Sequence, residues 1–406
     1  MISTLSDGAV AALPLEHGRN ELLADIMSTA QRVQVYAALS VLGVALLCGV
    51  ACALIFPDPF DLAVYRFGGN TVSHGDSLYG AEDPATGRLF TYPPFAALVF
   101  VPLAHLPVTF AAAAWTAVGV AALGITIHAF LHEQCRHVGP PVLVGLLLLA
   151  VATAPVRETL SFGQVNLFLM AAICADILLL RGRWCGVLVG LAAGIKLTPL
   201  VFVVFLVLIG RRVAATRAVL TFGATVVVGF VVIPASAAAF WTKAVWDPER
   251  VGGTEYIRNQ SLLGAMTRIL GSEPSTLVWL VVAVPVSAAV LTVAAVLWRD
   301  GARDAGLCLA AAAMLLASPI SWDHHWVWGV PAMVVLAGRG HWGVAAAWAV
   351  FLFAGCRIWV QHGERVELQW TWWENVWGNT FVWAAVLASA LLAFRSRTEA
   401  QLTRSP

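Results

Sequence analysis

Eleven apolar runs follow one another along the chain and restrict its fold to a bundle of membrane helices. They lie at about residues 35–56, 108–131, 141–155, 165–180, 184–210, 217–240, 276–298, 305–320, 326–337, 342–358 and 380–394. One membrane crossing needs about 20 such residues. Hydrophobic residues make up 60% of the 406 and charged residues only 12%, which excludes a soluble globular domain. The sequence therefore predicts an all-α polytopic membrane protein.

The run at 184–210 differs from the others because Lys196-Leu197-Thr198-Pro199 interrupts it. Arginines flank both ends, at Arg181 and Arg183 before the run and at Arg211, Arg212 and Arg217 after it. Because arginine-rich loops stay in the cytoplasm, both ends are predicted to be cytoplasmic. We expect two short helices or a re-entrant pair that turns near Lys196. The chain then has about 11–12 transmembrane passes with both termini inside.

This topology sorts the charges between the two faces. Fourteen of the 24 Lys and Arg residues fall on the cytoplasmic side, whereas the outer loops receive fourteen of the 23 acids. The outer loops span about 57–107, 156–164, 241–275, 321–325 and 359–379. Long loops of mixed chemistry are where functional sites concentrate. The working surface is therefore expected on the extracytoplasmic side of the plasma membrane.

The domain organisation is predicted to be simple. Residues 35–394 form one membrane domain, between cytoplasmic tails at 1–34 and 395–406. The segment Phe95–Leu106 is half apolar and too short to span, so we expect it to lie along the interface as a helix.

Two carboxylates follow the first apolar run. Asp58 and Asp61 lie beside a hydrophobic wall at the membrane surface, where a carboxylate can hold a raised pKa and act as a general base. The alternative is that either residue caps a helix that starts near Leu62. Spacing alone favours the cap.

A second polar group combines Asp323, His324 and His325 between Trp322 and Trp326. Paired histidines beside an aspartate are potential metal ligands, but adjacent residues seldom hold one ion without a third partner. The alternatives are a catalytic site and interfacial hydrogen bonding, and the residues do not separate them.

Lys196 stands alone inside an apolar stretch. A charge at membrane depth is usually functional or paired, and a lysine at a helix turn suits an anion such as a phosphate. The alternative is that Lys196 snorkels to the interface. The polar residues of the other outer loops, among them Arg157, Glu158 and Arg258, are supporting candidates, because arginines and amides commonly hydrogen-bond phosphates and sugar hydroxyls. The alternative for each of them is a helix cap or an ordinary loop residue.

The absence of several sequence motifs limits the classes of function that the chain can have. The chain has no P-loop, no dinucleotide-binding fingerprint and no Asp-x-Asp motif, so an enzyme of this kind needs an activated donor delivered through the membrane. Its seven cysteines show no Cys-x-x-Cys spacing, which gives no sign of a disulfide framework or zinc site. A net charge of +1 offers no attraction to nucleic acid.

Six short motifs follow one another along the chain. They are Asp61-Leu62-Ala63-Val64-Tyr65, Phe90-Thr91-Tyr92-Pro93-Pro94, Gly163-Gln164-Val165-Asn166, Gly194-Ile195-Lys196-Leu197-Thr198-Pro199, Asn259-Gln260-Ser261-Leu262, and Ser318-Pro319 through His325-Trp326. In this order they resemble glycosyltransferase family 87, the polyprenol-phosphate-mannose-dependent α-(1→2)-mannosyltransferases of actinobacteria with the GT-C membrane fold. The resemblance implies an inverting transfer of mannose from polyprenyl-phosphate-mannose to the 2-hydroxyl of a mannose on a glycolipid acceptor. Acceptors of the phosphatidylinositol mannoside or lipomannan type are implied.

The resemblance also implies roles for particular residues. Asp61 is the general base or its partner, whereas Asp58 lies outside the motif. His325, with His324 beside it, is the competing base. Lys196 and Arg258 hold the donor phosphate. Substrate-binding roles are implied for Tyr65, Tyr92, Gln164, Asn166, Asn259, Gln260 and Asp323. No metal or cofactor is expected.

Two rival functions remain open. A secondary transporter or flippase of a lipid-linked sugar would use Lys196 as its substrate site, although transporters commonly show repeated halves. A membrane acyltransferase would use His325 as its base.

Overall fold

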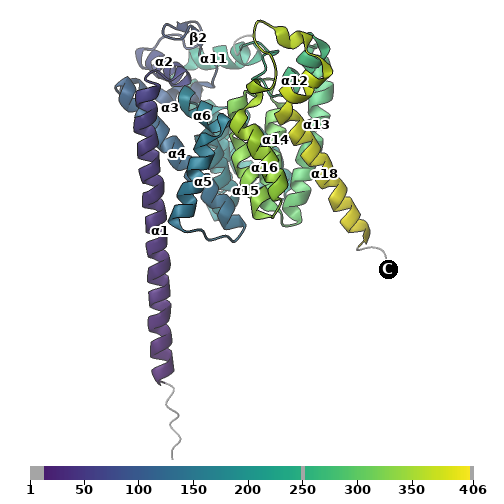
Figure 1. Ribbon diagram of the computed structural model, residues 1–406. Helices are drawn as coiled ribbons and strands as arrows, with labels where there is room; N and C mark the ends of the chain where they lie inside the picture. The colour runs from purple at the N-terminus through teal and green to yellow at the C-terminus, as the bar shows by residue number, and fades with distance from the viewer. Residues whose placement is uncertain (1–12, 248–251, 403–406) are drawn as a thin grey trace, which may run out of the picture.

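The computed structural model describes residues 13–247 and 252–402, with side chains at 32–247 and 252–394. It is a helical bundle whose sheet consists of one antiparallel pair of two-residue strands (Figure 1). The predicted all-α class is confirmed. Its elements are α1 (Leu13–Ile55), α2 (Phe60–His74), β1 (Glu82–Asp83), β2 (Arg88–Leu89), α3 (Pro94–Ala104), α4 (Val108–Glu133), α5 (Pro140–Ala152), α6 (Ala154–Phe162), α7 (Asn166–Cys174), η1 (Ala175–Leu179), η2 (Gly182–Trp184), α8 (Val187–Ile195), α9 (Leu200–Leu208), α10 (Arg212–Val232), α11 (Pro234–Thr242), η3 (Ala244–Trp246), α12 (Leu262–Leu270), α13 (Thr276–Arg299), α14 (Arg303–Ala317), η5 (Asp323–Trp328), α15 (Gly329–Gly338), α16 (Trp342–Ala354), η6 (Cys356–Ile358), η7 (Val366–Gln369), α17 (Trp372–Gly378) and α18 (Thr380–Leu402).

The apolar runs of the sequence become helices of unequal length. Within the described residues, four helices are long and apolar enough to cross a membrane, in α1, α4, α10 and α13. There are six if each bent pair counts as one span, because α5 and α6 meet at 74° and α17 and α18 at 80°. The other runs form shorter helices, so fewer full-length crossings are seen than the 11–12 predicted. Short helices pack around the long ones. The backbone between the short helices is not helical, and the polar residues gather there.

The interrupted run at 184–210 forms two short helices, α8 and α9, as predicted. Lys196 has an extended backbone (φ −145°, ψ 132°) that ends α8. Three glycines spaced four apart, Gly186, Gly190 and Gly194, place α8 against α10. A Cβ on Gly190 would lie 2.4 Å from the Ala218 carbonyl oxygen, so only small residues permit this approach.

The direction of this packing shows that α8 and α9 form a hairpin. Gly186 lies against Ala214, whereas Gly194 lies against Thr225, so α8 and α10 run parallel. Because α9 connects them within a few residues, it must return in the opposite direction. The turn between α8 and α9 therefore presents Lys196 at one end of the bundle.

Two of the arginines predicted to be cytoplasmic, Arg211 and Arg217, lie at the opposite end of the bundle. Arg211 donates to the Ile177 carbonyl at 2.7 Å, and Arg217 donates to the Gly182 carbonyl at 2.7 Å. Cations stabilise the carbonyl groups left free where helices end. These loops therefore close one end of the molecule, while the polar loops close the other.

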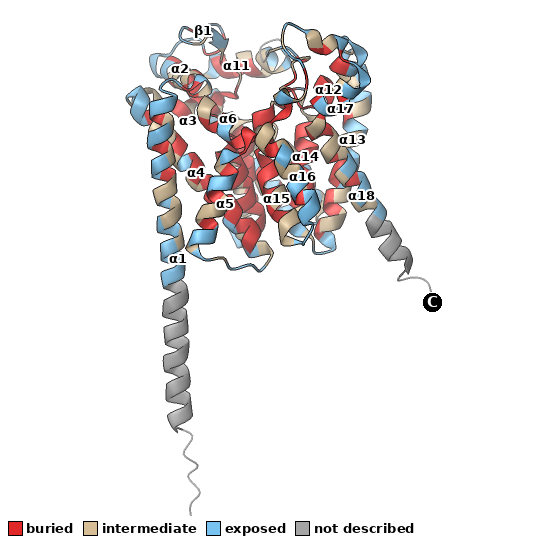
Figure 2. Cartoon of the chain, in the orientation of Figure 1, coloured by how far each residue is buried: buried red, intermediate tan, exposed pale blue. Residues whose placement is uncertain are grey.

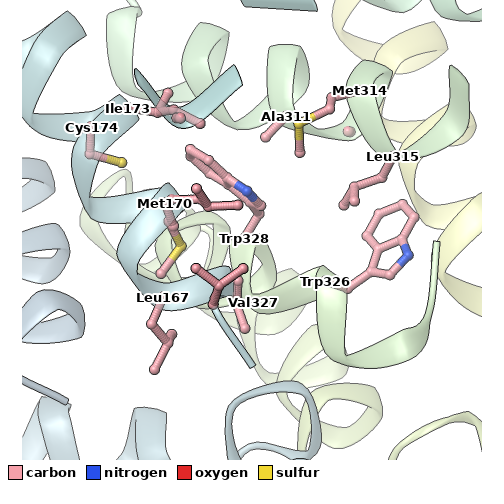
Figure 3. Packing of buried hydrophobic residues seen from close by; sticks show 14 of the residues in the cluster. Leu167, Met170, Ile173, Cys174, Ala311, Met314, Leu315, Trp326, Val327 and Trp328 are labelled. Carbon is pink, nitrogen blue, oxygen red and sulfur yellow. The ribbon is translucent and has the colours of Figure 1, made fainter. Parts of the chain in front are cut away.

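A buried apolar core lies directly beneath the polar end. Buried residues concentrate where the central helices face one another (Figure 2). Side chains of α7, including Leu167 and Met170, pack with Met314 of α14 and with Trp328 of η5 (Figure 3). This packing holds together the starts of α7 and η5, which carry Asn166 and His325.

The segment predicted as an interfacial helix, Phe95–Leu106, is largely the helix α3. Its partner is α2, because a Cβ on Gly69 would lie 2.6 Å from the Phe100 carbonyl oxygen. Arg66 of α2 also donates to the Leu106 carbonyl at 2.8 Å. The helices α2 and α3 therefore form one layer over the polar end of the bundle (Figure 1).

Candidate active site

One cavity of about 1210 Å³ opens at the polar end of the bundle. Each of the five loops predicted to share a face contributes to its wall, and the turn at Lys196 forms part of the wall as well. Its polar lining includes Asp61, Arg88, Tyr92, Gln164, Lys196, Glu255, Tyr256, Arg258, Glu273, His324, His325 and Arg365. The structure thus brings together the principal residues that the sequence singled out from segments far apart in the chain.

Asp61 lies on the cavity wall as the second residue of α2. The helix begins at Phe60 after Pro59, and no side chain caps it. The expectation that Asp58 or Asp61 caps a helix near Leu62 is therefore wrong, because α2 starts earlier and Asp61 falls inside its first turn. Burial raises the pKa of the Asp61 carboxyl, and His324, a Gln164 hydrogen bond and Lys196 offset part of that rise.

Tyr65, Tyr92 and Gln164 form a hydrogen-bonded group next to Asp61. The Tyr65 and Tyr92 hydroxyl oxygens lie 2.9 Å apart. Both hydroxyls donate to Gln164 Oε1, at 3.1 Å from Tyr65 and 3.3 Å from Tyr92. All three side chains are buried. Their polar atoms are therefore directed at one another and, through Gln164, at Asp61.

Lys196 is turned inward rather than toward an interface. Its Nζ lies 3.1 Å from His325 Nε2 and donates to Asn166 Oδ1 at 3.3 Å. Burial lowers the pKa of Lys196 to about 8, against an opposing effect of Asp61. These contacts replace the snorkelling alternative, because they hold the ammonium in the cavity wall.

His325 is the partner of this lysine. Burial, with the charge of Lys196 next in importance, holds the pKa of His325 well below its usual value, so the imidazole is neutral near pH 7. An ammonium can only donate a hydrogen bond, so Nε2 is the acceptor in the Lys196 contact. The lone pair that a general base needs is therefore engaged.

Arg258 lies between two carboxylates and an aromatic ring. Its Nε donates to both carboxylate oxygens of Asp323, at 3.0 and 3.1 Å, and its Nη2 forms an ion pair with Glu158. The guanidinium carbon lies 5.0 Å from the centre of the Phe162 ring. A guanidinium held from three sides keeps one orientation, and Nη1 has no protein partner within the described residues.

Glu158 and Arg357 complete this ion-pair network. Arg357 Nη2 donates to Glu158 Oε1 at 2.7 Å, so one buried carboxylate joins two arginines. Sequence reasoning treated Glu158 as a supporting residue and missed Arg357. The residues are 199 positions apart, and neither has a local pattern that could have predicted the pair.

His324 is buried and has no hydrogen-bond partner at either ring nitrogen within the described residues. Its Nδ1 lies 3.6 Å from Asp323 Oδ1, and burial lowers the pKa of the imidazole. The backbone carbonyl of His324 accepts from Thr159 Oγ1 at 2.8 Å and from Asn166 Nδ2 at 3.1 Å. The ring is thus held on the cavity wall with free hydrogen-bonding capacity.

Glu158, Asp323 and His324 also form the one group of potential cation ligands in the described part of the chain, with ligand atoms within 4.8 Å of one another. Both carboxylates, however, already form ion pairs with arginines. Glu158 pairs with two arginines and Asp323 with one. Two positive guanidiniums in the ligand sphere oppose a metal ion. The arrangement fits an ion-pair network better than a metal centre.

Asn259 and Gln260 do not face the cavity. The Asn259 amide donates to the Thr254 and Pro319 carbonyls at 3.1 and 3.2 Å, and its Oδ1 accepts from the Ser321 amide. The Gln260 amide donates to two other carbonyls, both at 2.7 Å. Both side chains are fully buried. Their predicted role in substrate binding is therefore replaced by a structural one. Asn259 joins the loop before α12 to the loop before η5, and Gln260 joins it to the end of α17.

Known proteins resemble this chain over most of its length. A polyprenol-phosphate-mannose-dependent alpha-(1-2)-phosphatidylinositol pentamannoside mannosyltransferase of Mycobacterium tuberculosis is 39% identical over 285 residues, which are 68% of this chain and 65% of the relative. The chain thus spans just under two thirds of that relative's length. A protein with the same description from Mycolicibacterium smegmatis is 34% identical over 72% of this chain and 73% of the relative.

A further relative covers more of the chain. It is a polyprenol-phosphate-mannose-dependent alpha-(1-2)-phosphatidylinositol mannoside mannosyltransferase of Mycobacterium tuberculosis, 29% identical over 88% of this chain and 92% of its own. No solved structure matches the chain. The family model of glycosyltransferase family 87 matches residues 90–319. Tyr92, Gln164, Lys196 and Arg258 lie within the match. The match covers more than half of the chain and shows that it belongs to glycosyltransferase family 87.

Proposed function

We propose that this glycosyltransferase moves mannose from polyprenyl-phosphate-mannose to the 2-hydroxyl of a mannose on a phosphatidylinositol mannoside. The transfer forms an α-1,2 linkage on the extracytoplasmic face of the plasma membrane. The observation that carries the proposal is the cavity in which the Asp61 carboxylate, Lys196 and Arg258 meet. The names of the relatives supply the donor and the acceptor class. Membership in a glycosyltransferase family favours this function over a transporter or an acyltransferase.

The proposed reaction is one displacement with inversion. The acceptor 2-hydroxyl attacks C1 of the β-linked mannosyl phosphate, so a C1–O bond to the acceptor forms as the C1–O bond to phosphate breaks. The bonding electrons leave with the polyprenyl phosphate, and the hydroxyl proton passes to the general base. One base and no covalent intermediate are needed, as in other inverting chemistry at a sugar.

Asp61 is the better candidate for this base. Its carboxyl lines the cavity and has a raised pKa, which brings its basicity closer to neutral pH. His325 competes poorly because Lys196 occupies its Nε2 at 3.1 Å. His324 lines the same cavity as Asp61, and neither of its ring nitrogens has a hydrogen-bond partner in the described part of the chain. We assign it to hydrogen bonds with a sugar hydroxyl.

Lys196 and Arg258 are assigned to the donor phosphate. Negative charge grows on that phosphate as the sugar leaves, and preorganised cations stabilise it most in the transition state. Lys196 is held by Asn166 and His325. Arg258 is held by Glu158 and Asp323, with Nη1 left over. Both cations are therefore oriented before the donor arrives.

The test is transfer by the purified full-length protein from synthetic polyprenyl-phosphate-mannose to a phosphatidylinositol mannoside. We expect an acceptor longer by one mannose, and removal of that mannose by an α-1,2-specific exomannosidase. A product resistant to this enzyme would contradict the linkage. Movement of the donor across proteoliposomes without any transfer would restore the transporter alternative.

A further inference from the structure

Backbone hydrogen bonds at the end of α6 fix the position of Gln164, whose side chain is buried. It follows Gly163, whose positive φ of 69° ends α6. The Gly163 amide donates to the Leu160 carbonyl at 3.1 Å, and the Gln164 amide donates to the Thr159 carbonyl at 2.8 Å. This pair of bonds is a common helix termination. A Cβ on Gly163 would lie 2.7 Å from the Leu62 Cβ, so the termination also places Gln164 against the start of α2.

The two tyrosines determine which way the Gln164 amide points. Oε1 lies within hydrogen-bond distance of both the Tyr65 and Tyr92 hydroxyls. Tyr65 Oη also accepts from the Val165 amide at 3.3 Å, which leaves the Tyr65 proton to be donated. The carbonyl oxygen has two lone pairs and the amide nitrogen has only donors. With Oε1 between the hydroxyls, the nitrogen of Gln164 is left to face Asp61, which lines the same cavity next to the contact between Gly163 and Leu62.

The opposite orientation of the amide would be unfavourable. It would direct Oε1 at the Asp61 carboxyl, and an ionised carboxylate has no proton to offer. The observed arrangement therefore matches the ionised form of Asp61, and an acceptor hydroxyl can give its proton only to that form. We propose that Tyr65, Tyr92 and Gln164 are positioning residues that orient the Asp61 carboxylate and maintain its basic form. This inference rests on the proposed function, in which Asp61 is the base.

The other groups that face Asp61 show why such a unit is needed. Burial opposes the charged carboxylate, whereas Lys196, Arg258 and the protonated form of His324 favour it. In the proposed complex, Lys196 and Arg258 bind the donor phosphate, so part of their charge is neutralised. His324 is kept neutral by its lowered pKa. The hydrogen bond from Gln164 is then the support for Asp61 that does not change when the donor binds.

The test is the pH dependence of kcat/KM for the acceptor, measured on the full-length enzyme. We expect Gln164→Leu to move the acid limb upward by about one to two pH units, the effect of one hydrogen bond to a charged group. Tyr65→Phe and Tyr92→Phe are expected to move it less and in the same direction, because each leaves one hydroxyl on Oε1. These milder variants keep the test valid if Gln164→Leu does not fold.

Tyr79→Phe is the matched control. Tyr79 is also a buried tyrosine, but its hydroxyl donates to the Tyr92 backbone carbonyl at 2.7 Å rather than to Gln164. We expect this variant to lose some thermal stability without moving the acid limb. If the acid limbs of the Gln164 and Tyr65 variants coincide with wild type while KM for the acceptor rises, the three residues bind substrate and the inference is wrong. Full activity of Asp61→Asn would instead overturn the proposed base itself.

Discussion

At the scale of single residues, the choice between two candidate bases depends on their hydrogen-bond partners. Asp61 and His325 both line the cavity, and their sequence patterns are equally suggestive. In the structure His325 Nε2 lies 3.1 Å from the Lys196 ammonium, whereas the Asp61 carboxyl lines the cavity beside Gln164. The carboxylate thus retains a lone pair that can accept a proton from the substrate, whereas the Nε2 lone pair of the imidazole is already used by Lys196.

Replacement of Asp61 by asparagine is expected to lower kcat by about 10²–10⁴-fold, the usual contribution of a general base. Asp58→Asn is the matched control, because Asp58 is exposed and three residues away on the same segment. It is expected to retain wild-type transfer. Steady-state kinetics with synthetic donor and acceptor measure both variants. Equal losses in the two would show that Asp61 has no special role.

The pH profile gives a second prediction. In the proposed mechanism, transfer requires an ionised Asp61 and a charged Lys196. Because the pKa of Asp61 is raised, activity should fall at a higher pH on the acid side than for an ordinary aspartate. Because the pKa of Lys196 is lowered to about 8, kcat/KM should fall again as pH rises through that region. Lys196→Arg, which stays charged, should extend the alkaline side upward, and an unchanged alkaline limb would count against Lys196.

At the scale of elements, the approach of α8 to α10 sets the position of Lys196. A Cβ on Gly194 would lie 2.5 Å from Thr225 Oγ1, and one on Gly190 would meet the backbone of α10. The stripe of small residues brings two helices close enough for the turn at Lys196 to reach Asn166 and His325. The position of the Lys196 ammonium in the cavity wall therefore depends on Gly190 and Gly194, which do not line the cavity.

Gly190→Val is expected to lower both thermal stability and transfer. Overpacking of a tight contact typically costs about 1–3 kcal/mol, and the forced separation would move the turn that carries Lys196. Gly223→Val is the control, because Gly223 lies in α10 where an added Cβ would meet no described atom within 4 Å. Thermal unfolding in detergent, together with transfer assays, measures both. A stable and fully active Gly190→Val would refute the link between packing and site.

At the scale of the whole molecule, the structure separates two chemically different ends. Five polar loops and the Lys196 turn surround one cavity, and arginines close the helix ends on the other side. The positive-inside rule then predicts that the cavity faces outward, where a lipid-linked sugar would be delivered.

Cysteine labelling in intact cells tests this orientation. Cys135 is the one exposed cysteine within the described residues and lies in a predicted cytoplasmic loop. An impermeant thiol reagent should therefore leave the wild-type protein unlabelled until the cells are opened. Ser73→Cys, placed in a Cys135→Ser background, should be labelled from outside because Ser73 is exposed at the cavity end. The reverse pattern would invert the topology.

The sequence by itself determined the class of protein, the position of most helices and the candidate site residues. Long apolar runs, arginine-rich loops and short motifs are local properties, so they can be recognised without knowledge of the fold. They led directly to Asp61, Lys196, Arg258 and the histidine pair. They also predicted the break in the run at 184–210, because Lys196-Leu197-Thr198-Pro199 interrupts the run and arginines flank both of its ends.

Only the tertiary structure decided what each polar group does. Lys196 meets His325 from 129 residues away, and Glu158 meets Arg357 from 199. Gln164 was predicted to bind substrate, yet its amide is held by two tyrosines and directed at Asp61. The role of a buried polar side chain depends on its partner and its burial. Both arise from contacts between distant segments, which no local pattern of residues encodes.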